Sequence, residues 1–260
     1  MTASRPVIAV TGGAQGIGKG ILIYFANRGY DCVVLDIDGE KAKETAKELR
    51  ARGSNVLEIE CDVADAKAVN NAYDKIREQY QRLDVQVNNA GLLIRERIME
   101  ASDEVSDKMI DVNLRGVLHT SRAAIGIMRG QGHGIIINAH SILGTFPDTG
   151  LGIYSATKAA VAALTRVLAA ECAPYGIRVN GYAPCVTATR MTQNIIDSRP
   201  TAKLAQIPMR KFGTTEQVAK VCWFLATDLS EYTTGTFIPV DGGAFDVQRP
   251  EEAWRLAGKL

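Results

Sequence analysis

The chain lacks a surplus of charge of either sign and has no block of like charges. Its 260 residues include 30 lysines and arginines against 29 aspartates and glutamates, a net charge of +1 at pH 7. Proteins that bind nucleic acids or anionic membranes usually concentrate basic residues. The N-terminal stretch MTASRPVIAV lacks the apolar core of a signal peptide, and no apolar run approaches the roughly 18 to 20 residues of a membrane span. We therefore expect a cytoplasmic protein that binds no nucleic acid and no membrane.

Paired cysteines and clustered histidines are also absent. The five cysteines are scattered and form no CxxC pair, and the three histidines stand alone in the sequence. A disulfide framework or a structural zinc site needs such residues at short, regular spacing. The sequence therefore predicts reduced thiols and no bound metal.

Short apolar runs rich in β-branched residues alternate with helical patterns along the chain. The expected strands cover residues 7–10, 32–36, 56–60, 85–89, 134–138, 177–182 and 235–240. This alternation is typical of repeated β-α units, in which helices cover both faces of a parallel sheet. We predict a doubly wound α/β fold with about seven parallel strands, formed by a single domain over residues 1–260.

Amphipathic patterns between these runs predict the helices. We expect helices over residues 39–53, 66–80, 103–128 and 153–173, and one that begins at a capping box formed by Thr214 and Gln217. Residues 187–213 are polar and contain two prolines. Irregular segments of this length often act as lids or binding elements, so we predict a substrate loop there.

A glycine-rich turn follows the first predicted strand and opens the first helix. Gly12, Gly16 and Gly18 occur in the stretch TGGAQGIG at G-x-x-x-G-x-G spacing. Glycine permits a tight turn and close approach of a ligand, and the amide N–H groups at a helix N-terminus favour an anion. The pyrophosphate of a dinucleotide is the expected ligand.

Asp36 ends the second predicted strand, about 20 residues beyond the turn. An acid at this place accepts hydrogen bonds from the adenosine ribose hydroxyls and repels a 2′-phosphate. Its neighbours in the sequence offer no compensating cation, since Gln15 lies in the turn and Ile37 follows the aspartate. The predicted cofactor is therefore NAD rather than NADP.

The stretch IYSATKAA places Tyr154 and Lys158 four residues apart, on one face of a predicted helix. In isolation the two residues would be an ordinary surface pair. A tyrosine is protonated at neutral pH unless a nearby positive charge favours the phenolate. The pair therefore also suits proton exchange with a substrate hydroxyl, and its context decides between the two interpretations.

Five stretches occur in a fixed order: TGGAQGIG, CDV at 61–63, NNAG at 88–91, YSATK at 154–158 and VDGG at 240–243. Together they resemble the short-chain dehydrogenase/reductase family, in its compact single-domain branch, over residues 7–243. The resemblance implies a Rossmann-type fold. It also implies hydride transfer between a nicotinamide cofactor and a secondary alcohol or ketone.

The resemblance also assigns roles to single residues. Tyr154 would be the base, Lys158 the cation that tunes it, and Ser141 the group that holds the substrate oxygen. Asn113, through a local helix distortion, would hold a water between Lys158 and solvent, which completes a catalytic set of Asn113, Ser141, Tyr154 and Lys158. The implied cofactor-binding residues are Gly12, Gln15, Gly16, Ile17, Gly18, Asp36, Asp62, Val63, Asn89, Ala90, Gly91, Tyr154, Lys158, Pro184, Thr187 and Thr189.

Cys185 departs from the family pattern, which has glycine at this place. Its side chain would either narrow the pocket beside the nicotinamide or be tolerated as any small residue, and a glycine that needed positive φ would not tolerate the change. His140 precedes Ser141, and strand alternation directs its side chain to the opposite face. We predict that His140 is a core or cofactor-side histidine rather than a catalytic one.

The predicted substrate pocket mixes apolar and polar side chains. Its expected members are Ser141, Leu143, Phe146, Cys185 and Met191. We expect a polyol, sugar or sugar-derived substrate, with a 3-oxoacyl thioester as the alternative. Arg95 and Arg97 would favour an acidic substrate if they lay at the entrance, although solvated arginines are the commoner outcome.

Other classes of function stay open. A binding protein that senses NAD(H) without turnover would not need Ser141, Tyr154 and Lys158 together. Epimerases and dehydratases of the same fold usually have a longer C-terminal substrate domain than the tail that follows residue 243. Self-association as a homodimer or homotetramer is expected through small residues on two long helices, namely Ala123, Ala124, Ala159, Ala160, Ala162 and Ala163.

Overall fold

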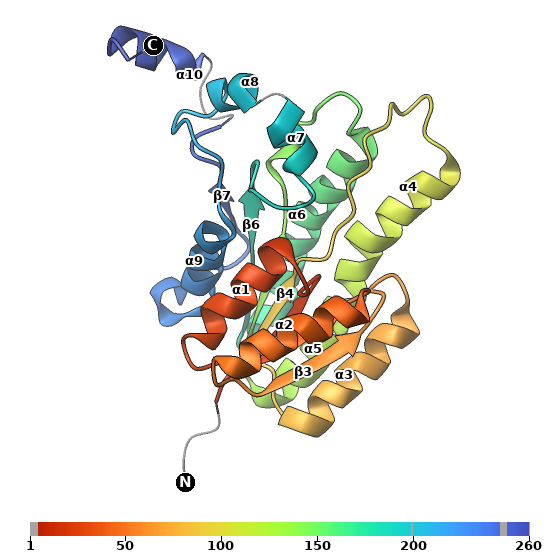
Figure 1. The fold of residues 1–260 in the computed structure, drawn as a ribbon. Helices are drawn as coiled ribbons and strands as arrows, with labels where there is room; N and C mark the ends of the chain where they lie inside the picture. The colour runs from red at the N-terminus through yellow and green to blue at the C-terminus, as the bar shows by residue number, and fades with distance from the viewer. Residues whose placement is uncertain (1–4, 199, 245–248, 260) are drawn as a thin grey trace.

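A seven-stranded parallel sheet forms the centre of the molecule (Figure 1). The computed structural model describes residues 5–198, 200–244 and 249–259. The strands are β1 (Val7–Thr11), β2 (Asp31–Asp36), β3 (Val56–Glu60), β4 (Val85–Asn88), β5 (Gly134–Ala139), β6 (Ile177–Pro184) and β7 (Phe237–Val240). They lie in the order β3-β2-β1-β4-β5-β6-β7. The predicted Rossmann-type fold is thereby confirmed.

Helices connect the strands and cover both faces of the sheet. The α-helices are α1 (Gly16–Ala26), α2 (Gly39–Ala51), α3 (Ala66–Tyr80), α4 (Asp103–Ile110), α5 (Gly116–Gln131), α6 (Gly152–Cys172), α7 (Gln193–Ser198), α8 (Pro200–Ala205), α9 (Thr215–Ala226) and α10 (Pro250–Leu256). Short 3-10 turns are η2 (Ile142–Gly144), η3 (Ala173–Tyr175) and η4 (Asp228–Ser230), and η1 (Asp111–Arg115) is a π-helical turn.

The apolar core lies in two layers, one on each face of the sheet. α1, α2 and α9 contribute to one layer, and α3, α5 and α6 to the other. Within β1, Ile8 and Val10 belong to the first layer, whereas Val7 and Ala9 belong to the second. Both faces of the central strands are therefore buried, which explains why they read as continuous apolar runs.

The sheet reverses its direction of growth between β1 and β4. After β3 the chain crosses to the other side of β1, so that β4 pairs with β1 in parallel register. The loops that leave the carboxyl ends of these two strands diverge, and open α/β sheets bind their ligands in the crevice that results. The glycine turn follows β1 and the NNAG stretch follows β4, so both reach this crevice.

Three segments differ from the sequence prediction. The helix expected over residues 103–128 is divided into α4 and α5 by the π-helical turn, which lies where the family resemblance implied a helix distortion at Asn113. The segment expected to be irregular, residues 187–213, contains the short helices α7 and α8, and the tail contains α10.

The capping box at the start of α9 is confirmed, because the side chains of Thr214 and Gln217 each accept a hydrogen bond from the other's backbone N–H. No helix in the described part of the chain is long and apolar enough to cross a membrane.

Candidate active site

A cavity of about 1110 Å³ opens at the carboxyl ends of the strands. Of the predicted cofactor-binding residues, all except Gly18 line it, and so do all five residues of the predicted substrate pocket. Of the predicted catalytic residues, Ser141, Tyr154 and Lys158 line the cavity, whereas Asn113 is fully buried behind it. Segments far apart in the sequence therefore converge on one site.

Glycine is required at the turn between β1 and α1. Gly12 and Gly16 have φ values of 62° and 57°, which other residues rarely adopt. A Cβ on Gly18 would lie 2.2 Å from the Gly12 carbonyl oxygen and 2.7 Å from Asn89 Nδ2. Gly18 thus allows the close packing of the turn, and the first N–H groups of α1, which have no partner within the helix, would suit an anion.

Asp36 is held firmly at the end of β2. Its Oδ2 accepts a hydrogen bond from the Ala14 backbone N–H at 3.0 Å, and its Oδ1 accepts one from the Asp38 N–H at 3.0 Å. Only 9% of the residue is exposed, on the cavity side of the glycine turn. A fixed carboxylate at this position suits ribose hydroxyls and disfavours an added phosphate.

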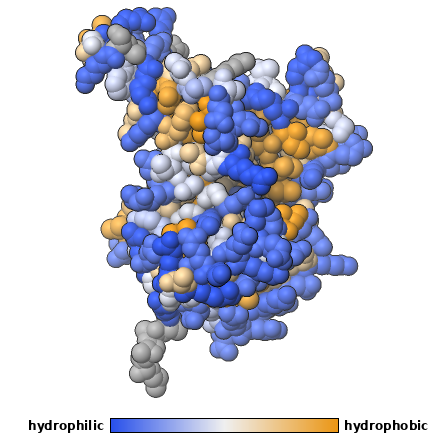
Figure 2. All heavy atoms as spheres, viewed as in Figure 1, coloured by the Kyte–Doolittle hydropathy of each residue, from blue (hydrophilic) through white to orange (hydrophobic). Residues whose placement is uncertain are grey.

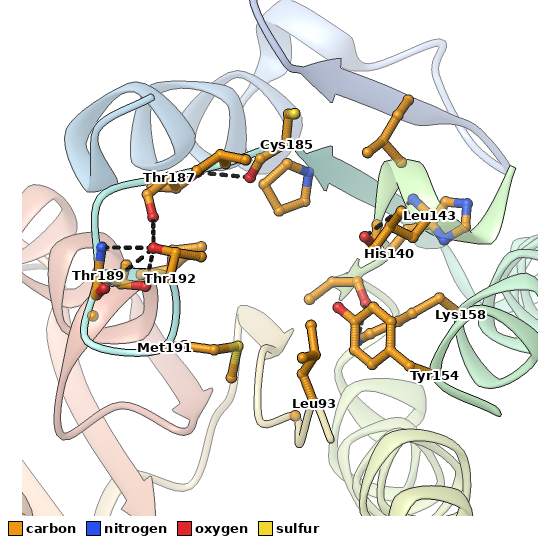
Figure 3. Close-up of a pocket in the computed structure, with 18 of the residues that line it drawn as sticks. Leu93, His140, Leu143, Tyr154, Lys158, Cys185, Thr187, Thr189, Met191 and Thr192 are labelled. Atoms are coloured by element: carbon orange, nitrogen blue, oxygen red, sulfur yellow. Dashed lines mark hydrogen bonds between the residues drawn. The ribbon is translucent and has the colours of Figure 1, made fainter. Parts of the chain in front are cut away.

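Tyr154 and Lys158 lie on α6 and point into the cavity (Figure 3), which Ser141, shortly after the end of β5, also lines. Burial raises the pKa of Tyr154, while a hydrogen bond with Ser141 opposes this effect. Burial lowers the pKa of Lys158 to about 8. The Lys158 ammonium lies 5.8 Å from the centre of the Tyr154 ring and donates to the Ala139 carbonyl at 2.8 Å. A cation is therefore fixed beside a buried phenol.

Asn113 lies in the π-helical turn, and its side-chain amide hydrogen-bonds both backbone polar groups of Leu92. Its Oδ1 accepts from the Leu92 N–H at 2.7 Å, and its Nδ2 donates to the Leu92 carbonyl at 2.8 Å. A Cβ on Gly91 would lie 3.4 Å from Asn113 Oδ1 and 3.6 Å from Lys158 Nζ. A side chain on Gly91 would therefore contact both Asn113 and Lys158, and the π-helical turn carries the amide to this position.

His140 is a buried packing residue that also lines the cavity. Its ring packs on Phe237 with 4.6 Å between ring centres. Burial lowers the pKa of His140 to about 4, and the charge of Lys158 adds to this effect. The imidazole is therefore neutral at physiological pH, as suits a core or cofactor-side histidine.

The segment after β6 folds over the glycine turn (Figure 3). The Thr192 hydroxyl donates to the Thr187 carbonyl and accepts from the Thr189 N–H, and Thr187 forms a β-bridge with Gly213. A Cβ on Gly16 would lie 3.6 Å from the methyl group of Thr189. These contacts place the predicted substrate loop against the predicted pyrophosphate site.

Cys185 fits this segment without backbone strain. Positive φ angles among the described non-glycine residues occur only at Gln81, Arg210 and Arg249. The missing glycine was therefore not needed for its conformational freedom at this position. The Cys185 N–H donates to the Val240 carbonyl at 3.2 Å, and burial raises the pKa of its thiol.

The mouth of the cavity is partly apolar. Figure 2 shows apolar side chains gathered on the surface between α4 and α7. Large apolar residues with exposed surface in the flanking segments are Ile98, Met99, Phe146 and Met191. Arg95 lines the cavity but pairs with Asp148, whereas Arg97 pairs with Glu100 outside it.

Sequence reasoning missed several lining residues because they belong to no motif. They are Leu92, Leu93, Lys108, Val112 and Leu151 in and around α4 and α6, and Lys203, Gln206, Ile207, Arg249, Pro250 and Glu251 in the loop and tail. The polar composition of residues 187–213 was the one available signal for Lys203, Gln206 and Ile207, and Arg249, Pro250 and Glu251 had none. Among the described residues, no cluster of three or more metal-ligating side chains occurs.

Comparison with known proteins defines the class of this molecule. The model of a family described as enoyl-(acyl carrier protein) reductase matches residues 12–244. The chain is 35% identical to the 3-oxoacyl-(acyl carrier protein) reductase FabG of Thermotoga maritima, over 94% of this chain and 99% of the relative. With this fold, this cavity and these matches, the chain belongs to the short-chain dehydrogenase/reductase family and is an oxidoreductase.

Two solved structures are similar to this chain over nearly its whole length. NAD⁺-bound xylitol dehydrogenase is similar with a TM-score of 0.88 and 25% identity, over 94% of this chain and all of that chain. A putative gluconate dehydrogenase from Agrobacterium tumefaciens is similar with a TM-score of 0.91 and 28% identity, over 94% of this chain and 98% of that chain.

Proposed function

We propose that this protein interconverts a secondary alcohol and a ketone with NAD as cofactor, on a polyol, sugar or sugar-derived substrate. The observation that carries the proposal is that Ser141, Tyr154 and Lys158 line the same cavity as Gly12 and Gly16 of the glycine turn. The xylitol and gluconate dehydrogenases among the similar structures support a sugar-derived substrate.

The residues present fit a dinucleotide. Gly12 and Gly16 form a turn in which any side chain would obstruct close approach, and the free amides of α1 suit the pyrophosphate. Asp36 would hold the ribose, and Asp62 with Val63 would border the adenine. Residues 89–91 would form the floor, and Thr187 and Thr189 would close over the nicotinamide half. When bound, NAD supplies the hydride acceptor for the oxidation.

The chain's own residues would handle the proton. Ser141 would hold the substrate oxygen and fix the reacting carbon, and Tyr154 would accept the hydroxyl proton as general base. Lys158 would favour the phenolate through its positive charge, since an opposite charge within a few ångströms stabilises the ionised form. Asn113, held behind Gly91, would keep the neighbourhood of Lys158 open to a water.

Production of NADH tests this function directly. The assay offers NAD with alditols, aldonates, steroids and 3-hydroxyacyl thioesters, and follows absorbance from NADH. Tyr154→Phe is expected to abolish turnover while NADH binding, followed by fluorescence, survives. Full activity in that variant would refute the mechanism, and NADH binding without turnover of any substrate would favour the sensor.

A 3-oxoacyl thioester is the second candidate substrate. The named relatives that reduce such substrates and the apolar mouth of the cavity both favour it. The two candidates differ in the reverse assay, where a 3-oxobutanoyl thioester of N-acetylcysteamine is offered with NADH. Faster reduction of this thioester than of ketoses would select the second candidate.

We further propose that the enzyme is cytoplasmic and assembles as a homodimer or homotetramer through α5 and α6. Ala159 and Ala163 are exposed on α6, but Ala124 and Ala162, expected to be exposed, are buried in the subunit's own core. The exposed alanines allow a second helix to approach closely. Ala163→Glu is expected to lower the mass measured by light scattering, and an unchanged mass would exclude this interface.

A further inference from the structure

The C-terminal segment closes the end of the cavity that lies away from the glycine turn. Lining residues there come from α8 and the turn after it, from the turn after β7, and from the N-cap and first turn of α10, namely Lys203, Gln206, Ile207, Ala244, Arg249, Pro250 and Glu251. Figure 1 shows α10 beyond the carboxyl edge of the sheet, on the side of α8 and opposite α2. The tail thus contributes a wall that no motif indicated.

One side chain attaches α10 to the rest of the molecule. The indole Nε1 of Trp254 donates to the Pro208 carbonyl at 2.9 Å, and the Arg210 guanidinium lies 5.8 Å from the centre of its ring. Arg210 has a φ of 51°, and its buried Nε and Nη2 have no hydrogen-bond partner among the described residues. The indole therefore serves both as donor and as cover for a cation.

The turn that carries Pro208 is fixed in its own right to the end of β7. The Met209 N–H donates to the Gly242 carbonyl at 3.1 Å. A Cβ on Gly242 would lie 2.9 Å from Ile207 Cγ2, and one on Gly243 would lie 3.0 Å from Pro208 Cγ. The two glycines of the VDGG stretch thus allow the turn at residues 207–209 to pack against the end of β7. Trp254 bonds Pro208 of the same turn, so α10 is held to β7 by way of this turn.

We propose that α10 is a specificity wall: Trp254 holds Pro250 and Glu251 against the distal end of the substrate and so limits its length. This inference rests on the proposed function, because Ser141 and Tyr154 must fix the reacting carbon at the other end. A short substrate ends before it reaches the wall. A long substrate meets Pro250 and Glu251, so its binding depends on Trp254, which is a positioning residue.

A length series of substrates tests the wall. The probes are erythritol, xylitol, sorbitol and volemitol, alditols of four to seven carbons, each with NAD. In Trp254→Ala the ratio of kcat/KM for volemitol to that for erythritol is expected to rise about tenfold, comparable to the effect of a methylene or more in a pocket. The value for erythritol itself is expected to stay unchanged, since on this proposal the short alditol ends before it reaches α10.

Two further variants separate the wall from a general loss of structure. Leu256→Ala alters an 82% exposed residue of the same helix and should leave the ratio at its wild-type value. A chain that ends at residue 248 removes the wall without changing Pro208 or Arg210, and should reproduce the raised ratio while NADH binding persists. A wild-type ratio in both Trp254→Ala and the shortened chain would overturn the proposal.

A readout without turnover keeps the two proposals distinguishable. The chain has two tryptophans, and the other, Trp223 on α9, packs among Tyr24, Phe25 and Tyr30. In Trp223→Phe, Trp254 alone emits, and volemitol added to the NAD complex should change its emission whereas erythritol should not. Absence of NADH formation with every substrate would refute the proposed function, and emission insensitive to both alditols would refute the wall.

Discussion

Lys158 is predicted to lower the free energy of unfolding, because its charged side chain is buried. Its folded-state pKa is about 8, against an ordinary value of 10.5, because the ammonium is buried. A tenfold change in proton affinity corresponds to about 1.4 kcal/mol, so keeping this charge buried costs about 3 kcal/mol at pH 7. Lys158→Met retains most of the side-chain volume and removes the charge. The variant should therefore be more stable than the wild type and inactive.

The pH dependence identifies the cause. Because the folded-state pKa lies below the unfolded one, the unfolded chain binds more protons between about pH 8 and 10.5, and stability rises with pH across this window. The buried charge lowers stability by its full amount below the folded-state pKa of about 8, and this effect disappears above the unfolded-state pKa of 10.5. The advantage of Lys158→Met should thus shrink from about 3 kcal/mol at pH 7 to about 1 kcal/mol at pH 10.

Urea denaturation followed by circular dichroism at the two pH values measures this difference. Lys211→Met, at an exposed position outside the cavity, is the matched control and should change stability by less than about 0.5 kcal/mol at either pH. An advantage of Lys158→Met that is equal at pH 7 and pH 10 would refute the assignment to a buried charge. So would a loss of stability at pH 7.

Three further outcomes follow from the cavity. Asp36→Ser should raise the ratio of activity with NADP to activity with NAD by about tenfold or more, measured as kcat/KM, because a fixed negative charge no longer opposes the 2′-phosphate; an unchanged ratio would mean that Asp36 does not read the ribose. Gly18→Ala should lower thermal stability and NADH affinity together, since its Cβ would lie 2.2 Å from the Gly12 carbonyl oxygen; wild-type values would contradict the geometry. Cys185→Gly should lower the free energy of unfolding by about 0.5 to 1 kcal/mol, the cost of the added backbone freedom. It should change KM for the substrate more than KM for NAD, and the reverse pattern would place Cys185 on the cofactor side.

The parts of the fold set by local pattern could be predicted from the sequence. β1 has apolar residues that face both core layers, and Thr214 with Gln217 forms the capping box that begins α9. The positions of Tyr154 and Lys158 on one helix follow from their spacing alone. Ser141 lines the same cavity because of the way β5 and α6 pack in the fold. The resemblance implied this arrangement, whereas periodicity did not.

Features set by tertiary contacts could not be predicted in this way. The helix expected over residues 103–128 contains a π-helical turn at Asn113, which hydrogen-bonds the backbone of Leu92, a residue distant in sequence. Periodicity gave no sign of this turn, and the family resemblance alone implied a distortion there. The tail was read as a short appendage, yet Trp254 returns it to Pro208. Neither contact leaves a periodic trace, since each depends on a single side chain that finds a partner across the fold.

The position of Asn113 depends on the number of residues in the π-helical turn. A π-turn holds about one residue more than an α-turn. Deleting one residue between Asp111 and Arg115 would let α4 and α5 join as one continuous α-helix, and α5 could keep its packing against the sheet. Asn113 would then rotate away from Leu92. An enzyme of this design can therefore lose its active-site arrangement through a single deletion that its hydrophobic core tolerates.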